Sequence, residues 1–281
     1  MNESDPIKSF FDFISHWNFT GIQSTLFLFL LGTYVLGSIK LYLKSINKTE
    51  FIKKTVVGLF GFFILGLALV GPLDVFSGEL FSAHMAQHIF VVIIGAPILM
   101  ASNPMATMIW SLPKYFRYGI SITLTKKGFV KRVLVIFTNP KIALPVFVVT
   151  LWGWHIPEAY NASLVNDYIH LIMHISLAVT GIFFWWPIIG SAPIRTPLSY
   201  PQKLVYLLLV VTPTAALAAI ITLSDHVIYT GYIGSPKHFG LSVLEDQRIG
   251  GLLMWLPGNF IYLSTMTIIF FKWFSNEEKK L

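Results

Sequence analysis

The chain of 281 residues contains no cysteine, which excludes disulfides, thiolate metal ligands and thiol redox chemistry. Charged side chains are also scarce, at 12% of the sequence, about half of what a soluble domain carries. Hydrophobic residues make up 55%. The first twenty residues hold more acids than bases, and the apolar run after them is too long for a signal peptide, so no cleavable signal is expected. This balance is typical of an integral membrane protein.

Seven apolar stretches are long enough, or nearly so, for a helix that crosses hydrocarbon, which takes roughly 20 residues. The sequence therefore predicts an all-α integral membrane protein, a single helical-bundle domain over residues 1–281 with no soluble domain attached. The expected spans cover about residues 22–43, 54–71, 80–101, 140–156, 167–190, 201–223 and 248–271. Close packing of the second span against a neighbour is favoured by its glycines, Gly58, Gly61, Gly66 and Gly71.

The basic residues fall on one side of these spans. Seventeen of the 20 lie in the segments around residues 40–54, 114–141, 195–203 and 272–280, whereas ten of the 13 acids lie on the other side. Lysine and arginine accumulate on the cytoplasmic side of a membrane. We therefore expect the N-terminus outside and the C-terminus in the cytoplasm. The same bias accounts for the net charge of +7, so no binding to nucleic acid is expected.

The longest inner connection, residues 103–139, mixes aromatic and apolar side chains with a basic cluster. This composition is typical of an amphipathic stretch that lies in the membrane interface and is held to anionic lipid. A docking surface for a partner is the alternative.

All eight histidines fall on the outer side of this arrangement, and five of them lie in or beside three spans at similar depth. His84 and His88 are four residues apart, and His170 and His174 repeat that spacing on another span. Residues four apart share one helix face, with Cβ atoms roughly 6 Å apart, so each pair can reach one ion or one pair of ions. His155, at the outer end of the fourth span, completes the set.

Imidazole binds copper, zinc, iron and nickel, and without cysteine the other ligands are oxygen and thioether sulfur. Ionisable groups inside a membrane are costly, so two such pairs at one depth favour metal ligation over a polar network or a proton path. Met85 and Met173 adjoin the histidines and carry soft thioethers, which favour Cu(I), but both lie one residue off the histidine face, so packing is the favoured role of each over co-ligation.

Ligating histidines commonly donate their second ring N–H to a carboxylate or carbonyl. The candidates for this supporting role are Asp246, Gln247 and Gln87. Asp74 and Asp225 are further candidates, although a solvated loop acid is the favoured interpretation of each. In the last outer loop, His226 and His238 could capture a metal before its transfer.

Several functions fit such a site. An assembly factor that carries metal needs several exchangeable ligands. A histidine-box metalloenzyme would add further boxes or an acid between the histidines, and neither motif contains one. A b-type cytochrome with His88 and His174 as axial ligands leaves three histidines unexplained. A transporter would need an acid or base deep in a span to couple ions.

Four stretches resemble the CtaG family of haem–copper oxidase assembly factors, which are seven-span proteins of bacterial plasma membranes. The first is HMAQH, from His84 to His88, and the second is WHIP, from Trp154 to Pro157. The third runs from YIHLIMH to FWWP, between Tyr168 and Pro187, and the fourth is DQRIGGLLMWLPG, from Asp246 to Gly258. They follow one another in order through the third, fourth, fifth and seventh spans.

The resemblance implies a copper-binding protein of the bacterial plasma membrane, not an enzyme, that delivers or inserts copper during maturation of cytochrome c oxidase. It carries the metal role onto His84, His88, His155, His170 and His174 and, less directly, a supporting role onto Asp246 and Gln247. The implied partners are an oxidase subunit, an extracytoplasmic copper donor and the lipid bilayer. A homodimer is a further option.

Overall fold

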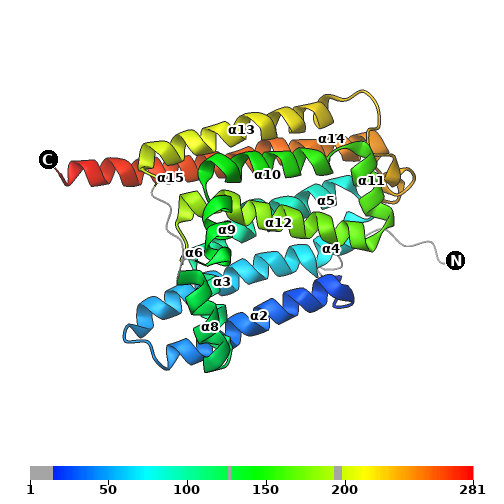
Figure 1. Ribbon diagram of the computed structural model, residues 1–281. Coiled ribbons are helices and arrows are strands. Elements are labelled where there is room, and N and C mark those ends of the chain that lie inside the picture. The colour runs from blue at the N-terminus through cyan, green and yellow to red at the C-terminus, as the bar shows by residue number, and fades with distance from the viewer. Residues whose placement is uncertain (1–14, 126–127, 193–197, 281) are drawn as a thin grey trace.

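Figure 1 shows a computed structural model of the chain, which describes residues 15–125, 128–192 and 198–280. These residues form helices and no strand. In the first half of the chain the elements are α2 (Gly21–Tyr42), α3 (Lys48–Leu69), α4 (Pro72–Ser77), α5 (Phe81–His88), the π-helical η1 (Ile89–Gly95), α6 (Ala96–Ala101), α7 (Pro104–Ser111), α8 (Lys114–Thr125) and α9 (Phe129–Phe137). The second half contains α10 (Pro140–Trp154), α11 (Pro157–Val165), α12 (Asp167–Ile189), α13 (Tyr200–Leu223), η2 (Thr230–Tyr232), η3 (Pro236–Phe239), α14 (Val243–Leu253), the π-helical η4 (Met254–Gly258) and α15 (Asn259–Glu278).

In the described chain, six helical segments are long and apolar enough to cross a membrane, or seven if the bent pair α9–α10 forms one span. The prediction of an all-helical membrane protein is confirmed. Four expected spans agree with their helices to within one residue at each end. The second span was predicted too short, because α3 begins at Lys48, where the Asn47 side chain accepts a hydrogen bond from Glu50 N. Hydropathy does not mark the first turns of α3 because they contain lysines, although the helix already begins there.

The fourth span also differs from the expectation. Its helix α10 has 15 residues, which at about 1.5 Å per residue fall short of a hydrocarbon layer about 30 Å thick. The preceding α9 meets it at 72°, with Asn139 and Pro140 at the break. If this bent pair crosses the membrane, both α9 and α10 must therefore contribute to the span.

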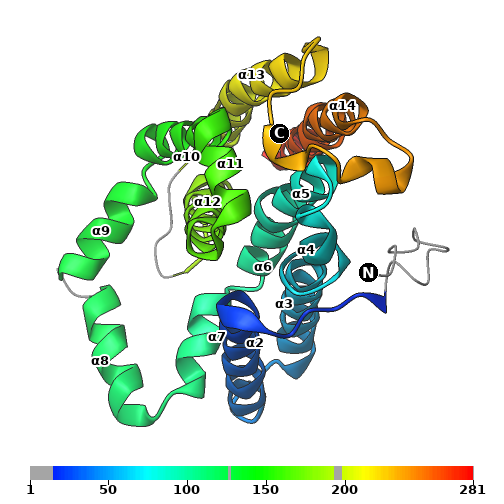
Figure 2. The same cartoon turned by 90° about the vertical axis from the view of Figure 1, so that its right-hand side faces the viewer.

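The segment 103–139 forms three short helices, α7, α8 and α9. Figure 2 shows α8 and α9 swung out as an arc beside the bundle. Several aromatic side chains on this arc are exposed, including Tyr115 at 84%, and Arg117 lies over the Trp110 ring at 3.9 Å. Its attachment to anionic lipid remains a prediction.

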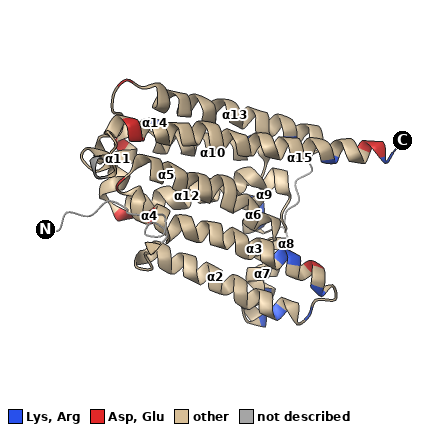
Figure 3. Ribbon diagram, turned by 180° about the vertical axis from the view of Figure 1, so that it is seen from behind, with Lys and Arg blue, Asp and Glu red and all other residues tan. Residues whose placement is uncertain are grey.

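The charges lie at opposite ends of the bundle. Figure 3 shows Lys and Arg gathered near α8 and the start of α3, at the end where α15 terminates, whereas most of the acids lie at the end that carries α4, α11 and the start of α14. We call these the basic end and the acidic end. Lys8, Lys126, Lys127 and Arg195 lie outside the described residues.

Two glycines allow close helix approaches. A Cβ on Gly250 would lie 2.3 Å from the Phe81 ring, so α14 can pack directly on the start of α5. A Cβ on Gly61 would lie 2.8 Å from Leu99 N, which allows the close packing expected of the second span, here of α3 against α6. Together these contacts fix the position of the segment from α5 to α6, in the interior of the bundle.

Candidate metal centre

Three histidine side chains converge between α5 and α12. One ring nitrogen from each of His84, His88 and His174 lies within 4.8 Å of the others, and all three residues are buried. Their ring centroids are 4.6 Å apart for His84 and His88, and 5.5 Å apart for His88 and His174. The helix spacing explains half of this arrangement, because residues four apart share a face. Packing of α12 beside α5 brings in the third ring.

The Nε2 atoms of this cluster have no hydrogen-bond partner. In the described part of the chain, the Nε2 atoms of His84, His88, His170 and His174 are all buried and unpaired. A buried polar atom without a partner costs about 1–3 kcal/mol, and native proteins leave few of them. Four such atoms on neighbouring rings fit a bound cation, because neutral imidazole nitrogen is a strong metal ligand.

The hydrogen bonds of Tyr232 fix the tautomer of His84. The Tyr232 hydroxyl donates its single proton to Ser77 O at 2.9 Å, so it accepts from His84 Nδ1 at 3.1 Å and from the Tyr160 hydroxyl at 3.0 Å. The proton of a neutral His84 ring therefore sits on Nδ1, and Nε2 carries a free lone pair. Burial raises the pKa of Tyr232 and of Tyr160, so both phenols stay neutral.

A chain of amides fixes His174 in the same way. Its Nδ1 lies 2.8 Å from Oε1 of Gln23, a carbonyl oxygen that can only accept. The Gln23 amide nitrogen donates to Leu69 O and, at 2.8 Å, to Asp74 Oδ1. Gln87 donates to that same oxygen at 2.9 Å. Asp74 is therefore bonded to two glutamines that lead to the cluster, and its interpretation as a solvated loop acid was wrong.

The other two candidate ligands flank the three converging rings. The His170 ring lies 4.3 Å from that of His174 and 5.3 Å from that of His84, and it is only partly buried. On the other side, the His155 ring lies 6.4 Å from that of His88. His155 Nδ1 lies 2.7 Å from the carbonyl oxygen of Leu151, which again leaves Nε2 free of a proton in the neutral ring. The five histidines thus form one continuous group.

Asp246 does not hold a histidine ring. Its carboxylate accepts from Phe81 N at 2.7 Å, from Ser82 N at 3.1 Å and from the Ser82 hydroxyl. These groups form the N-terminus of α5, whose first N–H groups lack partners within the helix. The expectation of a hydrogen bond from a ligating histidine to Asp246 was therefore wrong, since this buried carboxylate caps the helix that carries His84 and His88.

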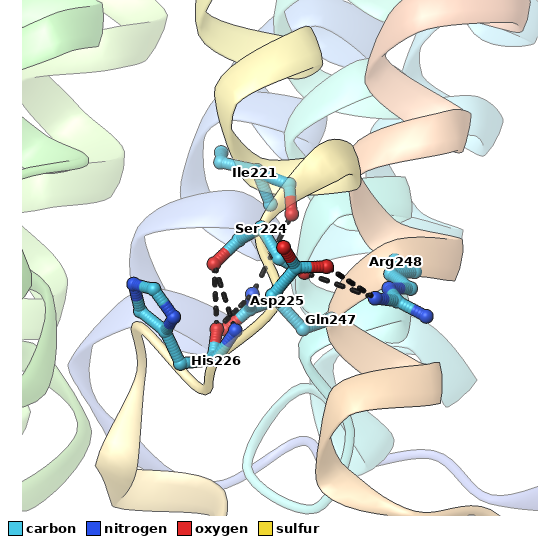
Figure 4. A network of polar contacts seen from close by, with 6 residues as sticks. All are labelled: Ile221, Ser224, Asp225, His226, Gln247 and Arg248. Atoms are coloured by element: carbon cyan, nitrogen blue, oxygen red, sulfur yellow. Dashed lines mark hydrogen bonds and ion pairs between the residues drawn. The ribbon is translucent and has the colours of Figure 1, made fainter.

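The two expected glutamines also act at a distance from the rings. Gln87 donates to Ala68 O and to Asp74, so it reaches His174 only through Asp74 and Gln23. Gln247 accepts from Ile228 N at 2.7 Å. It also donates to His226 O at 3.2 Å, as Figure 4 shows. Gln247 thereby fastens the loop that carries Tyr232 to α14.

Of the two loop histidines, His226 is separate from the cluster. The His226 ring is exposed and points away from the polar contacts that its backbone makes with Ser224 and Gln247 (Figure 4). His238 belongs to η3, and its side chain lies outside what the structure describes. Capture of metal by either residue remains a prediction.

Cavities adjoin the histidines on three sides. At the acidic end, a polar cavity of about 530 Å³ is lined by His170, Asp74 and Asp167. A largely apolar groove of about 480 Å³ between α2, α6 and α12 is lined by Gln23 and His174. Deeper in the bundle, a cavity of about 40 Å³ is lined by Met85, His88 and His155 among apolar side chains.

Sequence reasoning missed Gln23 and Tyr232, the residues that bond directly to ring nitrogens. Gln23 carried a usable signal, because it is a polar residue near the start of a long apolar run. Tyr232 carried none, since a tyrosine in a loop next to glycine is common and only the fold brings it to His84.

The bundle and its site define a class: a helical membrane protein with a buried histidine cluster suited to a transition metal. The sequence profile of the cytochrome c oxidase caa3 assembly factor family, CtaG, matches residues 32–276. The chain belongs to this family, which confirms the resemblance carried by its histidine motifs.

Two mycobacterial proteins are similar to part of this chain. Uncharacterised proteins from Mycobacterium bovis and Mycobacterium tuberculosis are each 26% identical to this chain over 189 residues. The match covers 64% of this chain but only 28% of each relative, so the matched region is less than a third of the length of each relative. No solved structure matches the chain.

Proposed function

We propose that this protein binds copper in its histidine cluster and delivers it to a subunit of cytochrome c oxidase during maturation of the oxidase. Copper is then the cargo of the protein, and no catalysis is required. Two observations carry the proposal together: one ring nitrogen from each of His84, His88 and His174 lies within 4.8 Å of the others, and the Nε2 atoms of these three residues are buried and unpaired. The family supplies the biological context, since it assembles a copper-containing oxidase.

Delivery also requires that the ion can enter and leave. In the proposed orientation the acidic end faces outward, as the distribution of lysine and arginine favours. The cavity beside His170 would then admit an ion from an extracytoplasmic donor, and its acids Asp74 and Asp167 suit a cation. The groove at His174 is lined by α2 and α12, two of the long apolar helices, which supports a handover within the plane of the bacterial plasma membrane.

The geometry favours a compact ion over haem. A haem-sized ligand needs a pocket of roughly 300 Å³ or more, whereas the cavity beside His88 holds about 40 Å³. The groove of about 480 Å³ is lined by His174 but not by His88, so it does not provide a pocket between these two rings. The His84 ring lies 4.6 Å from that of His88 and 5.9 Å from that of His174. It therefore occupies space that a porphyrin held between His88 and His174 would need.

Metal content tests the proposal. We expect the full-length protein, purified in detergent, to bind copper with nitrogen ligands, and the variant His84→Ala/His88→Ala to insert and fold but to lose most of that copper. The same variant should fail to support oxidase maturation in cells. An unchanged copper stoichiometry in this variant would rule out the cluster as the site.

A matched control removes two histidines elsewhere. His16→Ala/His226→Ala deletes the same number of imidazoles, neither of which belongs to the converging group, and should keep the stoichiometry of the unmodified protein. An optical spectrum of the same preparations separates the haem alternative, which would produce a Soret band.

A further inference from the structure

The sulfur of Met85 faces a ring nitrogen. Met85 Sδ lies 3.4 Å from His155 Nε2, and both residues are buried, Met85 completely. They come from α5 and from the end of α10, 70 residues apart in the chain. Packing was the favoured role of Met85 over co-ligation, and packing does not account for a sulfur placed on the lone-pair side of an imidazole.

The protons of His155 explain why this contact is unusual. Its Nδ1 lies 2.7 Å from Leu151 O, and a carbonyl oxygen can only accept, so Nδ1 carries the proton of the neutral ring. The thioether of Met85 is also only an acceptor. Two acceptors therefore face each other with no proton between them. A second proton on His155 would create a buried cation, and no described hydrogen bond or ion pair joins this ring to a carboxylate.

We propose that Met85 Sδ and His155 Nε2 form a second metal position, which takes a soft monovalent cation of the cuprous type. Thioether sulfur selects soft ions, whereas the neighbouring cluster offers imidazole alone. Bond lengths of about 2.0 Å to nitrogen and about 2.3 Å to sulfur would make an angle of roughly 100° at the ion across this gap. That angle suits the three- and four-coordinate geometry of such ions.

The position adjoins the cluster and opens onto the deep cavity. His88 and His155 have ring centroids 6.4 Å apart, and both residues line the same cavity as Met85. An ion leaving the cluster would meet the next free imidazole at His155. This inference rests on the proposed function, and it adds that the carrier has two metal positions of different softness.

X-ray absorption at the copper edge tests the proposal on the full-length protein loaded anaerobically with one and then two equivalents of Cu(I). We expect a sulfur scatterer near 2.3 Å at two equivalents, and its loss in Met85→Leu, which keeps the side-chain volume. The matched control is Met173→Leu, because Met173 is equally buried and also adjoins a histidine. That variant should keep the sulfur signal.

The outcomes separate the two proposals. Copper bound by nitrogen alone in the unmodified protein would overturn the Met85–His155 position and leave the proposed function standing. Sulfur scattering that persists in Met85→Leu would also overturn it. No copper bound at either loading would overturn both. Because the first readout uses the unmodified protein, poor folding of a variant cannot decide the result.

Discussion

The side-chain carbonyl of Gln23 lies 2.8 Å from Nδ1 of His174, across a separation of 151 residues. This bond joins the first described transmembrane helix to the candidate metal centre and leaves Nε2 of the neutral His174 ring without a proton. Gln23 precedes the stretch that matches the family profile, which begins at residue 32.

Replacing Gln23 with leucine should weaken copper binding. The variant leaves His174 Nδ1 without its acceptor, and loss of such a supporting bond typically lowers metal affinity about 10–100-fold. Competition with a chromophoric chelator measures the change. Thr25→Val, at an exposed position of the same helix, should leave the affinity unchanged. Equal affinities for Gln23→Leu and the unmodified protein would show that His174 needs no such support.

Tyr232→Phe should act on His84 in the same manner. The variant removes the hydroxyl that accepts from His84 Nδ1, and we expect the affinity for copper to fall about 10–100-fold. Tyr229→Phe is the control, because that buried hydroxyl donates to the backbone oxygen of His155 and touches no ring nitrogen. If both variants lowered the affinity equally, general damage to the loop would be the explanation.

Asp246→Ala should destabilise the protein. The change leaves Phe81 N buried without an acceptor, and we expect the free energy of unfolding to fall by about 2 kcal/mol, seen as a lower thermal midpoint in detergent. Asp225→Ala provides the comparison. Its side chain is 92% exposed and pairs with Arg248 at 3.5 Å, so we expect less than about 0.5 kcal/mol. Similar midpoints for the two variants would contradict the capping role of Asp246.

The absence of cysteine makes the proposed orientation easy to test. A thiol reagent that does not cross membranes should label Asp225→Cys in intact cells, because this residue lies in the exposed loop after α13. Ile46→Cys, in the exposed turn between α2 and α3, should be labelled only after the membrane is opened. The reverse pattern would place the acidic end in the cytoplasm.

The sequence predicts those parts of this structure that local rules govern. Hydropathy locates the long helices, and a four-residue spacing places His84 with His88 and His170 with His174 on shared faces. It does not locate partners that depend on tertiary packing. The carboxylate of Asp246 was expected to accept a hydrogen bond from a histidine ring. It accepts instead from a backbone N–H at the N-terminus of α5, although it comes from a helix more than 160 residues away in the chain. Asp74 was expected to be a solvated loop acid, whereas it bonds to Gln23 and Gln87. The sequence does not reveal these contacts because they form only when α2, α4 and α5 pack together.

The deep cavity limits the routes that would be open to an ion bound by the histidines. Beyond His88 and His155, the space of about 40 Å³ is walled by apolar side chains, apart from the thioethers of Met85 and Met254 and the hydroxyls of Thr214 and Tyr262. A bare ion moved into such surroundings would lose its ligands with little to replace them, at a cost of many kcal/mol. We therefore expect an ion bound by the histidines to leave through the cavity beside His170 or the groove at His174, and not through the apolar interior toward the basic end.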